Sequence, residues 1–192
     1  MYQKGNKEFA ILSLYLKGYD KRFYLREICK LSKLSLKTTQ RVLSSLEKEK
    51  ILKSEVSGKN KYFMLNLDNI KTKSYLEQAE IYNLMMFIEK YPVFKTFLKE
   101  IKDNALIIVF GSFAKFKADK ESDVDFVVIG KIKLPFHILP YKIHEINLSE
   151  GEFLKGFESE ETLIKKIVEN HVILNNPSFF INIMWNKYGR KR

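Results

Sequence analysis

The pattern of apolar and polar positions in the first third of the chain predicts three helices followed by a hairpin. The apolar residues of the first two helices recur at spacings of three and four, namely Phe9, Leu12 and Leu16, then Leu25, Ile28 and Cys29. Ser35 is a good capping residue and predicts the start of a third helix. Two strands, at 51–56 and 61–65, are expected to flank a turn at 57–60.

The remainder of the chain is predicted to mix helices with strands. Residues 68–103 contain no glycine and one proline, Pro92, so two helices separated at that point are expected. The apolar runs at 105–110 and 126–129 are typical of buried strands. The segment ETLIKKIVENHVIL, at 161–174, is expected to be helical.

The charge of the chain is concentrated near its start. The 192 residues carry a net charge of +11. Residues 1–70 hold 15 basic and 7 acidic residues, a net charge of +8, and the other 122 residues contribute +3. Such a local excess favours a nucleic-acid surface, although a lysine-rich exterior with no partner remains an alternative.

Cysteine usage and hydropathy narrow the class of protein. The single cysteine, Cys29, excludes an intrachain disulfide framework and a multi-cysteine zinc site. No apolar run reaches the length of a membrane span, and the N-terminus lacks the apolar core of a signal peptide. A cytoplasmic protein is therefore expected.

Candidate chemistry lies where the first apolar strand ends at Gly111 and Ser112. Glycine permits close approach to a ligand and serine adds a hydroxyl donor. Asp123 and Asp125 follow, and residues two apart in a strand share a face. Two adjacent carboxylates repel each other unless a cation lies between them, and Mg²⁺ is commonly held by one or two carboxylates plus substrate phosphates. The pattern predicts a metal–triphosphate site.

The first part of the chain, about 7–66, resembles the winged helix-turn-helix family. The resemblance rests on the stretch TTQRVLSSLEKEKILKSEVSGKNKYFMLN, in which the third helix runs into the hairpin. It implies double-stranded DNA as partner, with the third helix in the major groove and the wing on the backbone. The implied DNA contacts are Lys37, Thr38, Gln40, Arg41 and Ser44 on the helix, and Lys59 and Lys61 on phosphates. A protein-docking or dimerisation module is the alternative.

The stretch VFGSFAKFKADKESDVDFVV is similar to the minimal nucleotidyltransferase family of the polymerase-β-like superfold. The resemblance implies an α+β fold in which a winged helix domain precedes a small mixed sheet flanked by helices, as in an archaeal-type group. It divides the chain into 1–67, a helical connector at 68–103, and 104–192. By matching positions, Asp123 and Asp125 would hold Mg²⁺ while Gly111, Ser112 and Ser122 would bind a nucleoside triphosphate.

Two positions depart from the family pattern. Phe116 stands where members commonly have glycine, and by the same resemblance His144 falls at the place of a third catalytic acid. Glu145 is the nearest carboxylate but has the opposite strand parity. Metal and nucleotide binding could survive this change while transfer slows, or His144 could act as a general base.

Three functions stay open at this point. The chain is a nucleotidyltransferase acting on a protein or nucleic acid, or a DNA-binding regulator with a catalytically impaired domain. The third alternative, carried by the resemblance, is an antitoxin-like protein that pairs with a helical ribonuclease toxin. A homodimer is compatible with each, because winged helices frequently bind palindromes as dimers.

Overall fold

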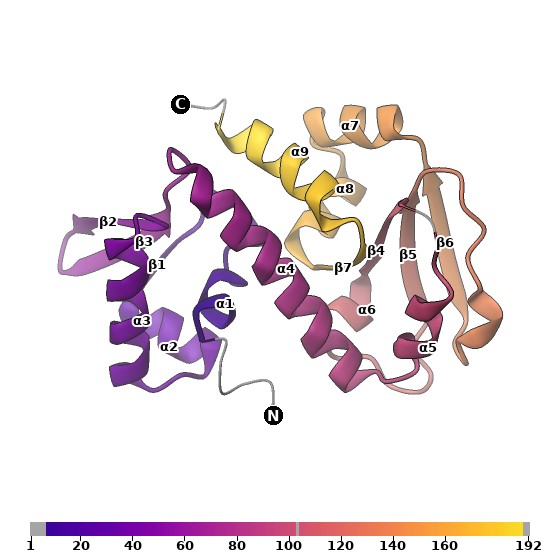
Figure 1. The fold of residues 1–192 in the computed structure, drawn as a ribbon, viewed down its shortest axis with the longest axis horizontal. Helices are drawn as coiled ribbons and strands as arrows, with labels where there is room; N and C mark the ends of the chain where they lie inside the picture. The colour runs from indigo at the N-terminus through magenta and orange to yellow at the C-terminus, as the bar shows by residue number, and fades with distance from the viewer. Residues whose placement is uncertain (1–6, 103, 190–192) are drawn as a thin grey trace. The chain divides into compact units, whose positions relative to one another are not determined.

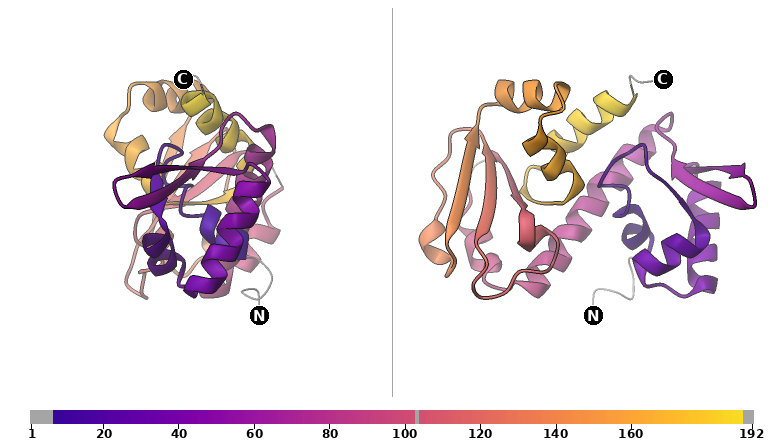
Figure 2. Two further views of the ribbon diagram at one scale, coloured as in Figure 1. Left: turned by 90° about the vertical axis from the view of Figure 1, so that its left-hand side faces the viewer. Right: turned by 180° about the vertical axis from the view of Figure 1, so that it is seen from behind.

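The computed structural model describes residues 7–102 and 104–189 (Figures 1 and 2). Its contacts divide the chain into two units, the first made of 1–82 with 184–192 and the second of 83–183. The predicted domain limits at 1, 103 and 192 lie outside the described residues. The division at 67 stays a prediction.

The first unit begins with three helices and a small sheet (Figure 1). In chain order the elements are α1 (Lys7–Leu12), β1 (Arg22–Tyr24), α2 (Leu25–Ser32), α3 (Leu36–Lys48), β2 (Leu52–Ser57) and β3 (Asn60–Leu65). Ser35 caps α3 as predicted, because its hydroxyl accepts a hydrogen bond from the Thr38 backbone N–H. The predicted hairpin is also confirmed: Ser57 pairs with Asn60, and Gly58 takes a positive φ of 59° in the turn.

Two details of this unit differ from the prediction. The helix expected to reach Leu16 ends at Leu12 and continues as turns, in which the Ser13 hydroxyl donates to the Ala10 carbonyl. A third strand, β1, pairs antiparallel with β3 and gives the order β1-β3-β2. Three residues are too few to show an alternation, so this strand arises from pairing with β3 and not from its own pattern.

Two helices follow, and they separate near Pro92 as predicted. They are α4 (Ile70–Lys90) and α5 (Phe94–Lys99). The start of α4 is fixed to the first unit, because the Thr72 hydroxyl donates to the Asn66 carbonyl and the Tyr75 hydroxyl donates to Glu49 at 2.7 Å.

The Tyr75–Glu49 bond predicts a specific alkaline response. Glu49 accepts a hydrogen bond from the phenolic hydroxyl and raises the pKa of Tyr75 to about 12, from an ordinary value near 10. A raised pKa contributes stability that is present below about pH 10 and is lost as the pH rises towards about 12. Tyr75→Phe should therefore show a shallower loss of unfolding free energy than wild type across this window, measured by urea denaturation. Tyr24→Phe is the control and should follow wild type; an identical slope for Tyr75→Phe would contradict the assignment.

The second unit is built on a four-stranded mixed sheet, which confirms the predicted sheet type. Its elements are β4 (Leu106–Phe110), α6 (Gly111–Ala114), β5 (Val124–Ile129), the 3-10 helix η2 (Phe136–Ile138), β6 (Ile143–Leu148), α7 (Glu150–Glu158), α8 (Thr162–Glu169) and β7 (His171–Asn175). The strand order is β6-β5-β4-β7, in which β5 and β6 are parallel and the other pairs antiparallel. The last helix, α9 (Pro177–Gly189), continues from this unit into the first.

One predicted helix is partly wrong. The sequence predicts helix throughout 161–174, but α8 ends at Glu169 and 171–175 form β7. Val172, Ile173 and Leu174 are all buried, so β7 is covered on both faces although it is an edge strand of the sheet. His171 is buried beside them, and its Nδ1 lies 3.0 Å from the Ile167 carbonyl. Burial and this contact indicate that His171 has a structural role.

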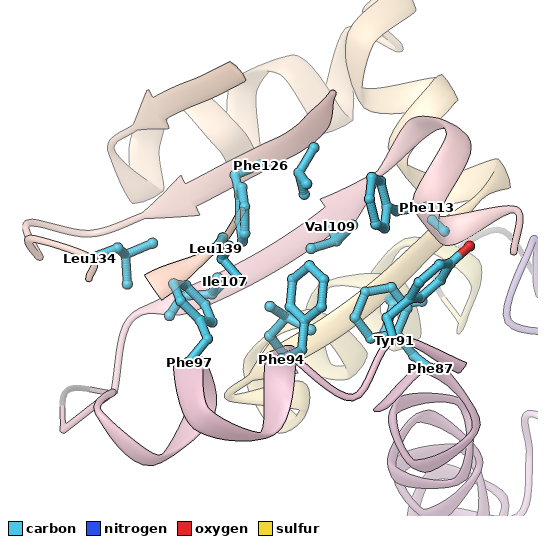
Figure 3. Packing of buried hydrophobic residues seen from close by; sticks show 14 of the residues in the cluster. Phe87, Tyr91, Phe94, Phe97, Ile107, Val109, Phe113, Phe126, Leu134 and Leu139 are labelled. Carbon is cyan, nitrogen blue, oxygen red and sulfur yellow. The ribbon is translucent and has the colours of Figure 1, made fainter. Parts of the chain in front are cut away.

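An aromatic core fixes the sheet to α4 and α5 (Figure 3). Phe94 contacts Phe87 with ring centroids 4.7 Å apart, and Phe97 contacts Phe126 of β5 at 5.6 Å. Phe113 of α6 joins the same core through Tyr91, at 4.8 Å. The short turn after β4 is therefore anchored by a fully buried ring. Within 7–102 and 104–189, no helix has the length and apolar character needed to cross a membrane.

Candidate functional site

Three neighbouring strands bring polar side chains to one end of the mixed sheet. Strand β4 ends at Phe110, which pairs with Asp125 near the start of the antiparallel β5. The parallel strand β6 places His144 opposite Asp125 on the other side. Gly111, Asp125 and His144 therefore meet at one end of the sheet, although His144 lies 33 positions after Gly111 in the sequence.

Gly111 lies directly against the Asp125 carboxylate. Its φ is +69°, and a Cβ built on it would stand 2.1 Å from Asp125 Oδ2. A left-handed backbone and the absence of any side chain are both required here, and glycine meets both requirements. The Gly-Ser turn and the carboxylate consequently form one structure.

Gly111→Ala is expected to disrupt this structure. The added methyl must displace the Asp125 carboxylate, and the left-handed backbone adds strain of about 1–2 kcal/mol. Thermal and urea denaturation should show a stability loss of about 1–3 kcal/mol. The matched control is Gly151→Ala in α7, where nothing lies within 4 Å of the new methyl, and which should retain or slightly exceed wild-type stability because alanine favours a helix. Equal stabilities for the two variants would contradict the close approach.

Asp123 and Asp125 have partly exposed carboxylates at this end of the sheet. Their side chains are 35% and 30% exposed, whereas Val124 and Phe126 are fully buried, as the alternation along the strand predicts. The two acids are thus accessible to a ligand and supported from behind by the core.

His144 of β6 and Lys142, which directly precedes this strand, face the two acids. The His144 imidazole places Nε2 3.5 Å from Asp123 Oδ2 and Nδ1 3.4 Å from Asp125 Oδ1. The Lys142 ammonium lies 3.5 Å from Asp123 Oδ2. These are long contacts of exposed groups, so they contribute little to stability and can be exchanged for a ligand.

Glu145 is not brought to the carboxylate pair. The β5–β6 register is continuous from Val124 opposite Ile143 to Ile129 opposite Leu148, without a bulge. Glu145 therefore shares the parity of Phe126 and faces away from His144. The structure brings together Gly111, Asp123, Asp125 and His144, and leaves Glu145 on the other face of the edge strand.

Ser122 shapes the turn that leads into Asp123. Its hydroxyl donates to Asp119 Oδ1 at 2.8 Å and accepts from the Asp119 backbone N–H at 3.0 Å. Glu121 N–H also donates to Asp119 Oδ1, and the Ser122 bond is the main cause that lowers the pKa of Asp119. Sequence reasoning missed Asp119, although an aspartate three residues before a serine is typical of such turns.

Asp123 and Asp125 are the residues that could hold a metal ion. In the part of the chain that the structure describes, no group of three or more His, Cys, Asp or Glu side chains has the arrangement to bind one. Two carboxylates suit Mg²⁺ in particular, because this ion retains waters and takes further oxygens from substrate phosphates. The donor set and the tight Gly111 turn both fit a metal–nucleotide ligand.

Comparison with known protein families identifies the class of this domain. Residues 92–182 match the family model of the nucleotidyltransferase domain. The nucleotidyltransferase domain thus spans α5 to the first part of α9 and contains every residue of the site just described. Comparisons with curated proteins and with solved structures give no match.

The match supports a nucleotidyltransferase-like function and confirms the resemblance read from the Gly-Ser and Asp-x-Asp stretch. Such domains use a nucleoside triphosphate and generally a divalent metal. The winged helix, the archaeal type and DNA binding stay predictions.

The other candidate residues lie on the first unit, outside the nucleotidyltransferase domain. Lys37, Gln40, Arg41 and Ser44 are exposed along α3, and Lys59 is exposed at the hairpin turn. Lys37, Arg41 and Lys59 form no ion pair within the described ranges. Gln40 and Ser44 also line a groove of about 280 Å³ between α3 and β3.

Two acidic side chains near α3, Glu47 and Glu55, are already paired. Glu47 accepts hydrogen bonds from the Ser54 hydroxyl and from Lys61 Nζ, the latter at 2.9 Å, and the Ser54 bond is the main cause that lowers its pKa. Glu55 pairs with Arg22 at 2.7 Å. Positive side chains are therefore left available on this surface. Two candidates have partners of their own: Lys61 pairs with Glu47, and the Thr38 hydroxyl oxygen accepts from Ser35.

Proposed function

We propose that this chain is a DNA-binding protein whose nucleotidyltransferase domain binds a Mg²⁺–nucleoside triphosphate and transfers the nucleotidyl group to a protein or nucleic acid. The observation that carries the proposal is the Asp123–Asp125 pair, held at one end of the sheet with Gly111 packed against one carboxylate. The family match at 92–182 supports the same chemistry.

Different residues of the site would bind the metal and the phosphates. Asp123 and Asp125 would hold Mg²⁺, which when bound neutralises the charge of the phosphates. Gly111 and Ser112 would position the triphosphate beside the carboxylates. An acceptor oxygen then forms a bond to the α-phosphorus while the bond to pyrophosphate breaks, and the acceptor proton must leave. His144 lies beside both acids and is the nearest group able to accept this proton.

A catalytically impaired domain is the second candidate, and the position of His144 favours it. Metal-dependent transfer usually employs a further carboxylate for the ion that activates the attacking oxygen. His144 stands in that place, and the continuous β6 register keeps Glu145 away. In this case the domain would bind nucleotide and report it to a DNA-binding module, as in a transcriptional regulator.

His144→Asp separates the two candidates. If the domain is impaired for lack of an acid, the substitution supplies a carboxylate at the correct strand parity and should raise transfer of labelled nucleotide at least about tenfold. If His144 serves as the general base, the same change should lower transfer by about 100-fold, within the range for such groups. His137→Asp, at an exposed position on η2, is the control and should leave transfer unchanged.

DNA binding is proposed for the first unit on three supports. They are the net charge of +8 in 1–70, the exposed basic and polar stripe on α3, and the resemblance of 7–66 to winged helix domains. The hairpin β2–β3 would act as the wing, with Lys59 on a phosphate.

An antitoxin-like role with a helical ribonuclease toxin rests on the resemblance alone. A pull-down should then recover a stoichiometric helical partner whose toxicity the chain suppresses. Recovery of no such partner would leave the DNA-binding transferase as the proposal.

A further inference from the structure

The turn after α6 is closed by a residue that is unusual for its backbone conformation. Phe116 has a φ of +57°, a left-handed conformation that costs a side-chain-bearing residue free energy. The Phe116 N–H donates to the Phe113 carbonyl, and the Lys117 N–H donates to the Ser112 carbonyl. This pair of bonds is the Schellman motif, in which glycine is the usual residue at the left-handed position.

Contacts from α4 hold Phe116 in this conformation. Lys90 Nζ donates to the Phe116 carbonyl, and the Phe116 ring lies 6.3 Å from the Phe87 ring. Beyond α4, the Tyr91 hydroxyl accepts from the Ala118 N–H at 3.2 Å. The end of α4 and the residue after it thus contact three groups of the segment 116–118: the carbonyl and the ring of Phe116, and the backbone N–H of Ala118.

Backbone hydrogen bonds connect this segment to the Gly-Ser turn itself. The Lys115 N–H donates to the Gly111 carbonyl, and the Lys117 N–H donates to the Ser112 carbonyl. Both residues that would meet the triphosphate are therefore hydrogen-bonded to the segment that Lys90 fixes. A turn that is already ordered loses less conformational freedom when a ligand binds.

We propose that Lys90 is a positioning residue for nucleotide binding. By holding Phe116 left-handed, it keeps Gly111 and Ser112 in their binding geometry before the nucleotide arrives. The inference rests on the proposed nucleotide function and adds a residue outside the Gly-Ser and Asp-x-Asp motifs. Lys90 precedes the carboxylates by more than 30 residues and acts through the backbone of Phe116 without touching the ligand.

The test compares Lys90→Met and Lys90→Arg with wild type. Each chain is titrated with Mg²⁺ and each of the four common nucleoside triphosphates, and hydrogen exchange is followed at the amides of Lys115, Phe116 and Lys117. Lys90→Met should exchange these amides about tenfold faster and bind nucleotide about tenfold more weakly, which is the effect expected from releasing one strained residue. Lys90→Arg keeps the donor and should restore both values. The control Lys95→Met, on an exposed position of α5, should match wild type.

A second comparison isolates the role of the left-handed residue. Glycine adopts this conformation without strain, so Phe116→Gly should make Lys90 less necessary. Lys90→Met should then weaken nucleotide binding less in the Phe116→Gly background than in wild type, and this non-additivity would not arise from a general loss of stability.

The outcomes distinguish this inference from the function on which it rests. If wild type binds none of the triphosphates, the proposed function fails and the positioning role fails with it. If wild type binds nucleotide and Lys90→Met binds it equally well, only the positioning role is overturned. Weaker binding that Lys90→Arg does not restore, or equal effects in both Phe116 backgrounds, also overturns it.

Discussion

Replacing Asp123 and Asp125 together by asparagine is expected to abolish labelling of any acceptor by nucleotide. Asparagine keeps the shape of the side chain but removes the two negative charges that a divalent cation requires. Loss of metal-assisted charge stabilisation of several kcal/mol corresponds to a fall of roughly a thousandfold or more. The measurement is transfer of label from a radioactive nucleoside triphosphate in the presence of Mg²⁺.

The fold should survive this double substitution. Both side chains are about one third exposed, and their distances to the His144 ring are 3.5 and 3.4 Å, so the melting temperature should change by only a few degrees. Glu145→Gln is the matched control, because it removes a carboxylate from the neighbouring strand on the other face and should leave transfer intact. Labelling that persists in the double variant would contradict the assigned metal site.

The second large effect is expected on DNA. Replacing Lys37, Arg41 and Lys59 together by alanine should reduce the slope of log affinity against log salt by about 0.9 for each phosphate that is no longer neutralised, or about 2.7 for all three. These three side chains are exposed and form no ion pair in the described part of the first unit, so their charge is available to phosphates. Fluorescence anisotropy with duplex DNA at several salt concentrations measures the slope.

A charge-matched variant separates a specific surface from net charge. Replacing Lys95, Lys99 and Lys120 by alanine removes the same three charges from exposed positions of the second unit and should leave the slope unchanged. Lys61→Ala is expected to have a smaller effect than Lys59→Ala, because the Lys61 ammonium already lies 2.9 Å from Glu47 Oε2. Equal slopes for the two triple variants would remove α3 and the hairpin from the DNA surface.

Local signals predicted most of the secondary structure. The Ser35 cap, the hairpin turn and the separation of α4 from α5 at Pro92 depend on residues close together in sequence, and each is found as expected. The misassigned segment at 161–174 shows the limit, because Val172 of β7 follows Val168 of α8 at the helical spacing of four residues. A short apolar stretch does not distinguish a buried helix from a buried strand.

The candidate site was predictable only in part, for a related reason. The spacing of Asp123 and Asp125 fixes their common face within one strand. The position of His144 depends on parallel pairing between β5 and β6, and the hydrogen bond from Lys90 to Phe116 depends on packing of α4. Such non-local pairings leave no local trace, so the sequence could name His144 only through a family resemblance.

The central claim is that the nucleotidyltransferase domain binds a metal–nucleotide complex through Asp123 and Asp125. Calorimetric titration of the full chain with each of the four nucleoside triphosphates, with Mg²⁺ and with EDTA, tests it most directly. The account predicts saturable binding of at least one triphosphate with Mg²⁺, and its loss in EDTA and in the double asparagine variant. Binding of equal strength without Mg²⁺, or no binding of any triphosphate with it, would contradict the account.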